Sequence, residues 1–217
     1  IICSINTQTG SITLSSIARD TAVEVPGYKS RQRLNTAFKY GSNEDIGKGA
    51  ELAMKTVNVN FQMNIQRYVL VNIHGLADII QALGGVDMYL TAEEAKAINY
   101  ELFTKEPMDS NKGREKLAKQ DGVQHLDGIQ AVMYARLRSV DNDFKRTERQ
   151  RHLLDLMLKK VLDDGIKLSE VYKLVRACLP YAKTDMSIWD MGGLAWDVLT
   201  SGMLKKLGQG GSLMEEF

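Results

Sequence analysis

Short apolar runs alternate with amphipathic segments along the chain of 217 residues. Residues 1–7 and 12–18 are β-prone runs separated by a polar linker that contains a glycine, so the pattern predicts a hairpin. A third, shorter run at 23–25 ends in a Pro-Gly turn signal. Residues 68–73 and 86–90 are apolar in the manner of buried strands.

Helical periodicity occupies most of the remaining sequence. Segments 33–41 and 44–57 repeat apolar residues on one face, and Asn43 is the expected N-cap of the second. Residues 75–83 form a further helical period that ends at a glycine pair, and Thr91 begins a capped helix. The second half of the chain is predicted to be helical over 126–136, 147–163, 168–178 and 187–200.

The order of these elements predicts the fold class. Strands come first and helices are interleaved without regular βαβ winding, so we expect an α/β fold with a mixed central β-sheet flanked by helices. Residues 104–122 are polar and irregular, which predicts a surface loop or flap. No internal repeat or low-complexity linker divides the chain, so residues 1–217 are predicted to be a single domain. The chain opens in the middle of strand-like sequence and stops without a terminating pattern, which predicts a fragment truncated at both ends.

Composition narrows the functional classes. The 28 Lys and Arg residues nearly balance the 27 Asp and Glu residues, so a globally basic protein that coats nucleic acid is not expected. Cys3 and Cys178 are the two cysteines, and their spacing suggests neither a zinc cluster nor a disulfide scaffold. Two free thiols and a single disulfide both remain open. No apolar run approaches the ~20 residues that span a bilayer.

Positive charge concentrates between residues 136 and 151, where six basic residues face three acidic ones. The basic residues are Arg136, Arg138, Lys145, Arg146, Arg149 and Arg151. Residues 147–150 match a capping box, so a helix is predicted to begin there. Cations near a helix start oppose the helix dipole and cost ~0.3–1 kcal/mol each when exposed. A bound anion would offset that cost.

The helical phase gives these side chains a direction. At 100° per residue, one arc of roughly 80° holds Arg146, Gln150, Leu153, Met157 and Val161, so Arg146 and Gln150 are predicted to face inward over the core. Arg149 is predicted to lie at the edge of this stripe. The alternative is a solvated face with surface ion pairs of little energetic value. Because the planar guanidinium binds phosphate oxygens bidentately, the cluster predicts a site for a pyrophosphate or phosphodiester.

A weaker candidate piece follows the second strand. Arg19 and Asp20 lie where a strand ends, and Arg31 and Arg33 come shortly after. Arg19 and Asp20 could equally be a local pair that stabilises the turn. The three histidines, His74, His125 and His152, lack metal-ligand spacing. Phosphate-binding glycine loops and the serine-hydrolase elbow are absent from the sequence.

An ordered series of motifs resembles the LytR-CpsA-Psr proteins of bacterial cell-envelope assembly. Residues 16–21 are similar to the family's S-I-P-R-D-T, with Ala18 where proline is usual, and residues 33–38 are similar to K-I-N-x-A-Y. Further similarities join residues 71–87 to V-N-F…L-G-G-V-D, residues 126–138 to L-D-G-x-Q-A-L-x-Y-x-R-x-R, and residues 143–150 to D-F-x-R-x-x-R-Q. The resemblance is specific over residues 1–165 and looser beyond them.

This resemblance implies an α/β sandwich and an extracytoplasmic phosphotransferase. Such enzymes move a glycopolymer, teichoic acid or capsular polysaccharide, from an undecaprenyl-pyrophosphate carrier to peptidoglycan at the outer face of the bacterial cell membrane. The resemblance further implies Mg²⁺, an upstream membrane anchor, and an upstream strand that carries the main metal-linked aspartate. Both of these upstream parts are absent from this sequence.

The resemblance also assigns roles to individual positions. Arg138, Arg146 and Asp20 would be catalytic, and Asp20 would either orient an arginine or help hold the metal. The implied pyrophosphate ligands are Arg136, Arg138, Arg146, Arg149, Gln150, Arg19, Arg31 and Arg33. Two alternatives remain: a non-catalytic protein that binds polyprenyl phosphate, and a transcriptional attenuator, as the family has been labelled. The sequence has no helix suited to reading DNA, so no nucleic-acid partner is expected.

Overall fold

The strands of the computed structural model form antiparallel pairs. The structure describes residues 1–6, 8, 11–43, 45–105, 111, 113–138, 143–163, 176 and 179–200. Within them, the pairs are β1 (Ile2–Asn6) with β2 (Ser11–Ser15), β3 (Ala22–Val23) with β4 (Gln32–Arg33), β5 (Val69–Val71) with β8 (Ala182–Thr184), and β6 (Val86–Leu90) with β7 (Gly122–Leu126). The predicted hairpin is the β1–β2 pair, and the α/β class is confirmed. The described strands form four two-stranded ladders in place of one continuous central sheet.

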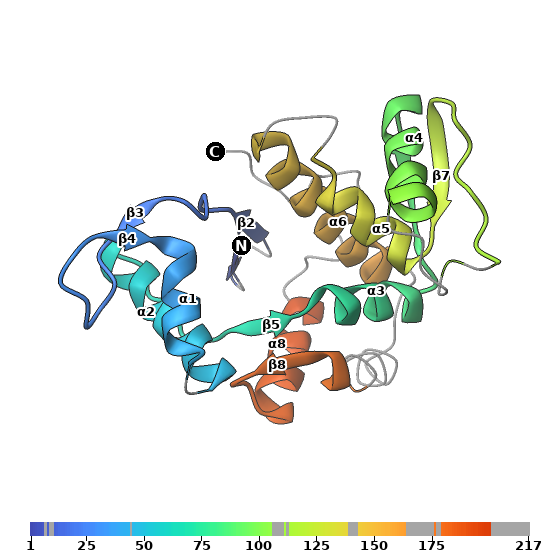
Figure 1. The fold of residues 1–217 in the computed structure, drawn as a ribbon. Helices are drawn as coiled ribbons and strands as arrows, with labels where there is room; N and C mark the ends of the chain where they lie inside the picture. Colours follow the sequence, from blue (N-terminus) through green and yellow to red (C-terminus); the bar gives the residue numbers. More distant parts are fainter. Residues whose placement is uncertain are drawn as a thin grey trace.

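Helices supply the larger part of the described fold (Figure 1). The α-helices are α1 (Leu34–Gly41), α2 (Ile46–Phe61), α3 (Ile73–Ala82), α4 (Ala92–Tyr100), α5 (Gly128–Arg136), α6 (Asp143–Asp163) and α8 (Ile188–Thr200). A single π-helical turn, η1 (Glu101–Lys105), continues α4, and a 3₁₀ turn, η3 (Leu179–Tyr181), precedes β8. None of the helices among these residues combines the length and the apolar character needed to span a membrane.

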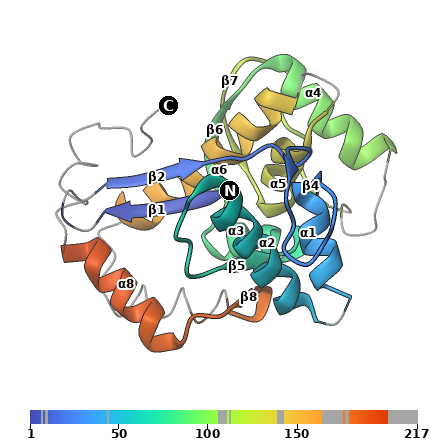
Figure 2. The same cartoon turned by 90° about the vertical axis from the view of Figure 1, so that its left-hand side faces the viewer.

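The helices form two groups with the β1–β2 hairpin between them. Figure 1 shows α1 and α2 on one side, α4, α5 and α6 on the other, and β5 with α3 linking the two groups. In the second view the hairpin projects past α6, and α8 lies below the hairpin on the same side of the picture (Figure 2). The open end of the hairpin, where β2 ends, lies near the first turns of α6.

The main core lies beneath α5 and α6. Its largest fully buried side chains include Ile80, Leu90, Ile98, Leu126 and Leu153, none more than 1% exposed. Each such side chain stabilises the fold by about 1.5–3 kcal/mol on burial. The core therefore fixes α5 and α6, which carry the predicted arginines, against α3 and β6.

The contact between α3 and α5 is unusually close at Gly128. A Cβ atom added there would lie 1.9 Å from the backbone carbonyl oxygen of Ala77. Only glycine allows the start of α5 to approach α3 in this way. The position of α5, and of Arg136 at its end, therefore depends on this glycine.

Two predicted helix starts are wrong, and both errors concern caps. Asp45, not Asn43, caps α2, because its extended backbone lets the carboxylate accept the Gly47 N–H at 2.7 Å. Helix α6 begins at Asp143, so Thr147 of the predicted capping box lies inside the helix. The capped start at Thr91 is confirmed as a full capping box with Glu94.

The predicted loop 104–122 is shorter than expected. Its first two residues belong to η1, residues 114–121 are irregular as predicted, and Gly122 already begins β7. β7 and β8 are strands that the sequence pattern missed. The predicted helix 168–178 lies outside the described residues except for position 176.

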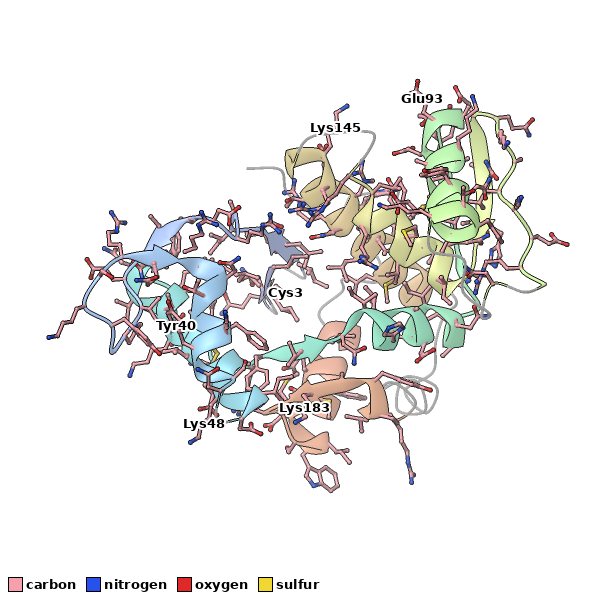
Figure 3. The ribbon with its side chains drawn as sticks, in the orientation of Figure 1. Cys3, Tyr40, Lys48, Glu93, Lys145 and Lys183 are labelled. Carbon is pink, nitrogen blue, oxygen red and sulfur yellow. The ribbon has the colours of Figure 1, made fainter. Side chains whose placement is uncertain are left out.

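The cysteine prediction is tested only in part. Cys3 lies on β1 with an exposed side chain (Figure 3). Cys3 is a free cysteine in this structure, and Cys178 lies outside the described residues.

Candidate functional site

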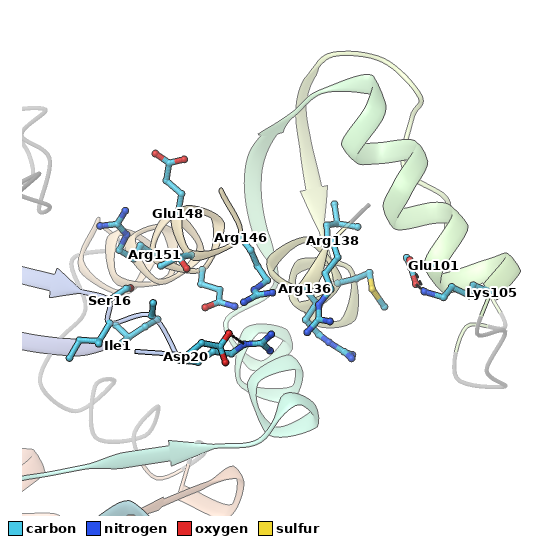
Figure 4. Close-up of a pocket in the computed structure, with 17 residues that line it drawn as sticks. Ile1, Ser16, Asp20, Glu101, Lys105, Arg136, Arg138, Arg146, Glu148 and Arg151 are labelled. Atoms are coloured by element: carbon cyan, nitrogen blue, oxygen red, sulfur yellow. Dashed lines mark hydrogen bonds and ion pairs between the residues drawn. The ribbon is translucent and has the colours of Figure 1, made fainter. Parts of the chain in front are cut away.

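A pocket of about 990 Å³ lies between the end of β2, the end of α5 and the beginning of α6 (Figure 4). Its lining carries six basic and three acidic side chains. These charged residues are Arg19, Lys105, Arg136, Arg138, Arg146 and Arg151, together with Asp20, Glu101 and Glu148. The pocket therefore brings together most of the basic residues that cluster between positions 136 and 151 of the sequence.

Arg136 and Arg138 reach the pocket from either side of a buried leucine. Helix α5 ends at Arg136, and the next residue, Leu137, leaves the helix with its side chain only 2% exposed. Since successive side chains of an extended segment point in opposite directions, a buried Leu137 leaves both arginines outside the core. Neither guanidinium has an ion-pair partner among the residues that the structure describes.

Arg146 and Gln150 reach the same pocket from the first turns of α6. Gln150 donates its amide N–H to the carbonyl oxygen of Ala135 at 3.4 Å, which ties α6 to the end of α5. Arg146 lies where the helix dipole is positive. Two sources of positive potential therefore coincide there, and both favour a bound anion.

The loop after β2 supplies Arg19 and Asp20. The Thr21 N–H and hydroxyl both donate to the Ala18 carbonyl oxygen, at 3.1 and 2.7 Å, which closes a tight turn around the two residues. Arg19 Nε donates to the Asp20 carboxylate at 3.3 Å. Both side chains also line the pocket. Arg19 and Asp20 can therefore be a local ion pair and residues of the site at the same time.

Arg149 lies elsewhere. The sequence placed Arg149 at the edge of the core stripe and Arg146 over the core, but Arg149 is 5% exposed and Arg146 lines the pocket. Arg149 donates to the Leu137 carbonyl oxygen at 2.7 Å, and its guanidinium carbon lies 5.8 Å from the ring centre of Tyr134. The stripe on α6 extends past the end of the core, so its first residue, Arg146, meets the pocket.

Arg31 and Arg33 also stand outside the residues that line the pocket. Arg31 donates to the Ala22 carbonyl oxygen at 2.8 Å and so supports the β3–β4 ladder. Arg33 has a side chain 72% exposed and lies 3.9 Å from the Asp20 carboxylate. Of these two arginines, only Arg33 is connected to the site, through Asp20.

Sequence reasoning left several lining residues without a role. They are Ile1, Ser16, Ile17, Ala18, Glu101, Lys105, Met133, Leu137, Thr147, Glu148 and Arg151. The helical phase of α6 could have identified Arg151, which follows Thr147 at i+4 and shares its face. Glu101 and Lys105 form an i,i+4 ion pair of 3.0 Å on the π-helical turn, which no sequence pattern indicated.

The described residues do not assemble a metal site. They contain no group of three or more His, Cys, Asp or Glu side chains that could hold an ion. Asp20 is engaged with Arg19 and Arg33, and the described His125 pairs with Asp87 at 2.7 Å on the exposed face of the β6–β7 ladder.

Comparison with known proteins gives consistent matches. The model of the LytR_cpsA_psr family matches residues 1–206. A curated relative from Enterococcus faecalis, polyisoprenyl-teichoic acid--peptidoglycan teichoic acid transferase TagU, is 32% identical over 199 residues, which are 91% of this chain and 57% of that protein. TagV of Bacillus subtilis, named as the same kind of transferase, is 25% identical over 95% of this chain and 48% of its own length. The chain thus spans about half the length of these relatives.

Solved structures share the fold. The crystal structure of B. subtilis TagV superposes with a TM-score of 0.69 at 24% identity and covers 94% of this chain and 71% of that one. A structure described as LytR-CPS2A-psr family protein YwtF (TagT) with bound octaprenyl pyrophosphate lipid gives a TM-score of 0.64 at 23% identity, covering 91% of this chain and 65% of the other. At this level of identity the likeness establishes the fold.

Proposed function

Since the chain belongs to the LytR-CpsA-Psr family, with a match over residues 1–206, we propose that it is the transferase domain of a glycopolymer ligase. The enzyme takes a teichoic acid or capsular polysaccharide from a polyprenyl-pyrophosphate carrier and joins it to peptidoglycan. The observation that carries this proposal is the pocket with six basic residues, two of which, Arg136 and Arg138, have no ion-pair partner among the described residues.

The proposed reaction is a displacement at phosphorus. An acceptor hydroxyl oxygen of peptidoglycan bonds to the phosphorus that carries the glycopolymer, and the bridging P–O bond to the carrier breaks. The carrier leaves as polyprenyl phosphate, and the hydroxyl proton passes to a base. Negative charge accumulates on the phosphate oxygens in such a transition state, so fixed cations at those oxygens supply most of the catalysis.

The residues divide this work between them. Arg138 and Arg146 neutralise the developing charge, because they approach the same pocket from two different elements. Arg136 and Gln150 add donors beside them. Asp20 acts on the site by holding Arg19 at 3.3 Å, since a paired guanidinium keeps one orientation before substrate arrives.

The proposal includes Mg²⁺, which Asp20 would bind together with ligands from outside the described residues. Asp20 would contribute one carboxylate oxygen, and Mg²⁺ prefers several oxygen ligands in octahedral geometry. The described residues do not supply that set, so no step is assigned to a metal.

The names of the relatives support the choice of substrate. The curated relatives in E. faecalis and B. subtilis are named for the transfer of teichoic acid to peptidoglycan, and the B. subtilis YwtF (TagT) structure is described with bound octaprenyl pyrophosphate. By extension we place this enzyme at the extracytoplasmic face of the cell membrane, with the carrier lipid in the bilayer. A membrane anchor outside this sequence belongs to the same proposal.

A transfer assay with the full-length protein tests the function. Arg138→Ala and Arg146→Ala should each lower the transfer rate at least about hundredfold, the usual cost of losing one donor to a developing oxyanion. Lys145→Ala is the matched control, because the substitution removes the same charge from α6 at a residue that does not line the pocket. Transfer that persists in the Arg138/Arg146 double variant would refute the mechanism. Carrier binding with no turnover in the unmodified protein would favour the non-catalytic carrier protein.

A further inference from the structure

One end of the pocket has no role in the proposed function, which places the pyrophosphate at Arg136, Arg138 and Arg146. Figure 4 shows Arg136 and Arg138 toward one end, Arg146 between, and Arg151 with Ser16 and Ile1 at the other. Arg151 comes from α6 and Ser16 from the segment that follows β2. Two elements that are distant in sequence therefore meet at this end.

Two polar atoms at this end are buried without a partner. They are the hydroxyl oxygen of Ser16 and Nε of Arg151, which are shielded from solvent and make no hydrogen bond within the structure. Buried donors in native proteins nearly always have a partner, and the exceptions call for an explanation. Both atoms belong to residues that line the pocket, so a ligand in the pocket is the natural partner.

The charge of Arg151 is likewise not balanced locally. Glu148 lies one helical turn earlier and lines the same pocket, yet Arg151 forms no ion pair with it or with any other described residue. An arginine fork next to a hydroxyl group is suited to the oxygens of a phosphate.

The spacing on α6 separates this end from the pyrophosphate. Arg151 follows Arg146 by five residues, a rise of about 7.5 Å along the helix axis and a rotation of about 140°. The rotation sends the two side chains away from α6 in different directions, and Figure 4 shows Arg151 beside Ser16 and away from Arg136 and Arg138. We therefore assign the group at Arg151 to the next part of the substrate.

We propose that Ser16 and Arg151 form a second anion subsite, which binds a phosphate of the glycopolymer beyond the pyrophosphate. The proposal rests on the proposed function, because it assumes that the carrier pyrophosphate occupies Arg136, Arg138 and Arg146. The subsite makes the enzyme selective for phosphate-bearing polymers. A pocket of about 990 Å³ is at the upper end of the range of small-molecule sites, which leaves room for more than a diphosphate.

Binding of three carrier lipids to the full-length protein tests the subsite. The probes are polyprenyl pyrophosphate alone, the same carrier with a phosphate-bearing glycopolymer, and the same carrier with an uncharged oligosaccharide. Arg151→Gln should raise the Kd of the phosphate-bearing probe about tenfold or more and leave the other two unchanged. Ser16→Ala should shift the same probe in the same direction by less, and Arg151→Lys should restore part of the loss. Arg138→Ala, the reference, should weaken all three.

Each other outcome overturns the subsite. Equal weakening of all three probes by Arg151→Gln would assign Arg151 to the pyrophosphate. Equal weakening of both glycan probes would indicate recognition of sugar hydroxyls, and no weakening would leave Arg151 without a role in binding. If Arg138→Ala leaves the bare carrier unaffected, the proposed function itself fails, which is distinguishable from a failure confined to Arg151. Thermal unfolding of each variant verifies the fold, and Ser16→Ala, a smaller change, keeps the test open should Arg151→Gln misfold.

Discussion

Replacing Arg149 by methionine separates two roles that this arginine could have. The substitution keeps an unbranched side chain of similar length and removes the guanidinium. As a pyrophosphate ligand, Arg149 would affect substrate affinity and leave stability unchanged. In its observed position, 5% exposed and bonded to the Leu137 carbonyl oxygen, it should affect stability first.

The size of the effect follows from the contacts of Arg149. A hydrogen bond from a charged donor contributes about 1.5–3 kcal/mol, and the 5.8 Å stacking on Tyr134 contributes about 0.5–2 kcal/mol. Methionine removes both but also removes the cost of burying a charge. We therefore expect a net loss of about 2–3 kcal/mol in the free energy of unfolding.

Urea unfolding measures this loss. With a slope of about 3 kcal/mol per molar urea, the midpoint should fall by about 0.7–1 M. Lys145→Met on the same helix is the control; because Lys145 is exposed, it should lower the midpoint by much less than Arg149→Met does. A variant with an unchanged midpoint and a large rise in the Kd for polyprenyl pyrophosphate would refute the structural role and return Arg149 to the ligands.

Three further predictions concern other parts of the fold. Gly128→Ala should destabilise the protein by about 3 kcal/mol or more, since its Cβ would lie 1.9 Å from the Ala77 carbonyl oxygen, and a lower melting temperature would show it. The N–H and hydroxyl of Ser187 donate to Asp190 and hold the pKa of that carboxyl below its ordinary value. Because the pKa of Asp190 is lower in the folded state, this stabilisation is present above the ordinary pKa and is lost as the pH falls through the folded pKa. Unfolding midpoints measured across the acid range should fall less steeply with pH in Ser187→Ala than in the unmodified protein. Asp20→Asn should slow transfer and leave the melting temperature nearly unchanged, whereas an unaffected rate would exclude Asp20 from the site.

The sequence predicted the members of the site better than their exact placement. Arg136, Arg138 and Arg146 could be grouped because they are close in sequence and their elements have a clear period. The phase of α6 gave the right stripe but not the end of the core, which depends on α5 and β6 packing beneath it. For that reason Arg149, nearly two turns into the helix, is buried where Arg146 was expected.

The missed elements have local causes. β7 has an alternating burial pattern over only five residues, and its partner β6 precedes it by more than thirty residues, so no local signal announces the pairing. The start of α6 was misplaced because Thr147 and its neighbours fit a capping box equally well inside a helix. Arg151 belonged to the basic cluster but was left out of the site because it lies about 140° around the helix from Arg146, outside the stripe predicted to face the core.

Leu137 has a consequence for how variants of this protein should be interpreted. It lines the pocket but has no polar side-chain group to offer the phosphate oxygens, and at 2% exposed it would be classed with the hydrophobic core. Yet Arg136 and Arg138 are its two neighbours in the sequence, and its carbonyl oxygen accepts a hydrogen bond from Arg149. The guanidinium groups of Arg136 and Arg138 carry like charges and repel one another. The fold holds them close together because the buried side chain of Leu137 fixes the backbone between them. A conservative change at Leu137 would therefore alter the distance between Arg136 and Arg138, so it belongs among the substitutions that change activity.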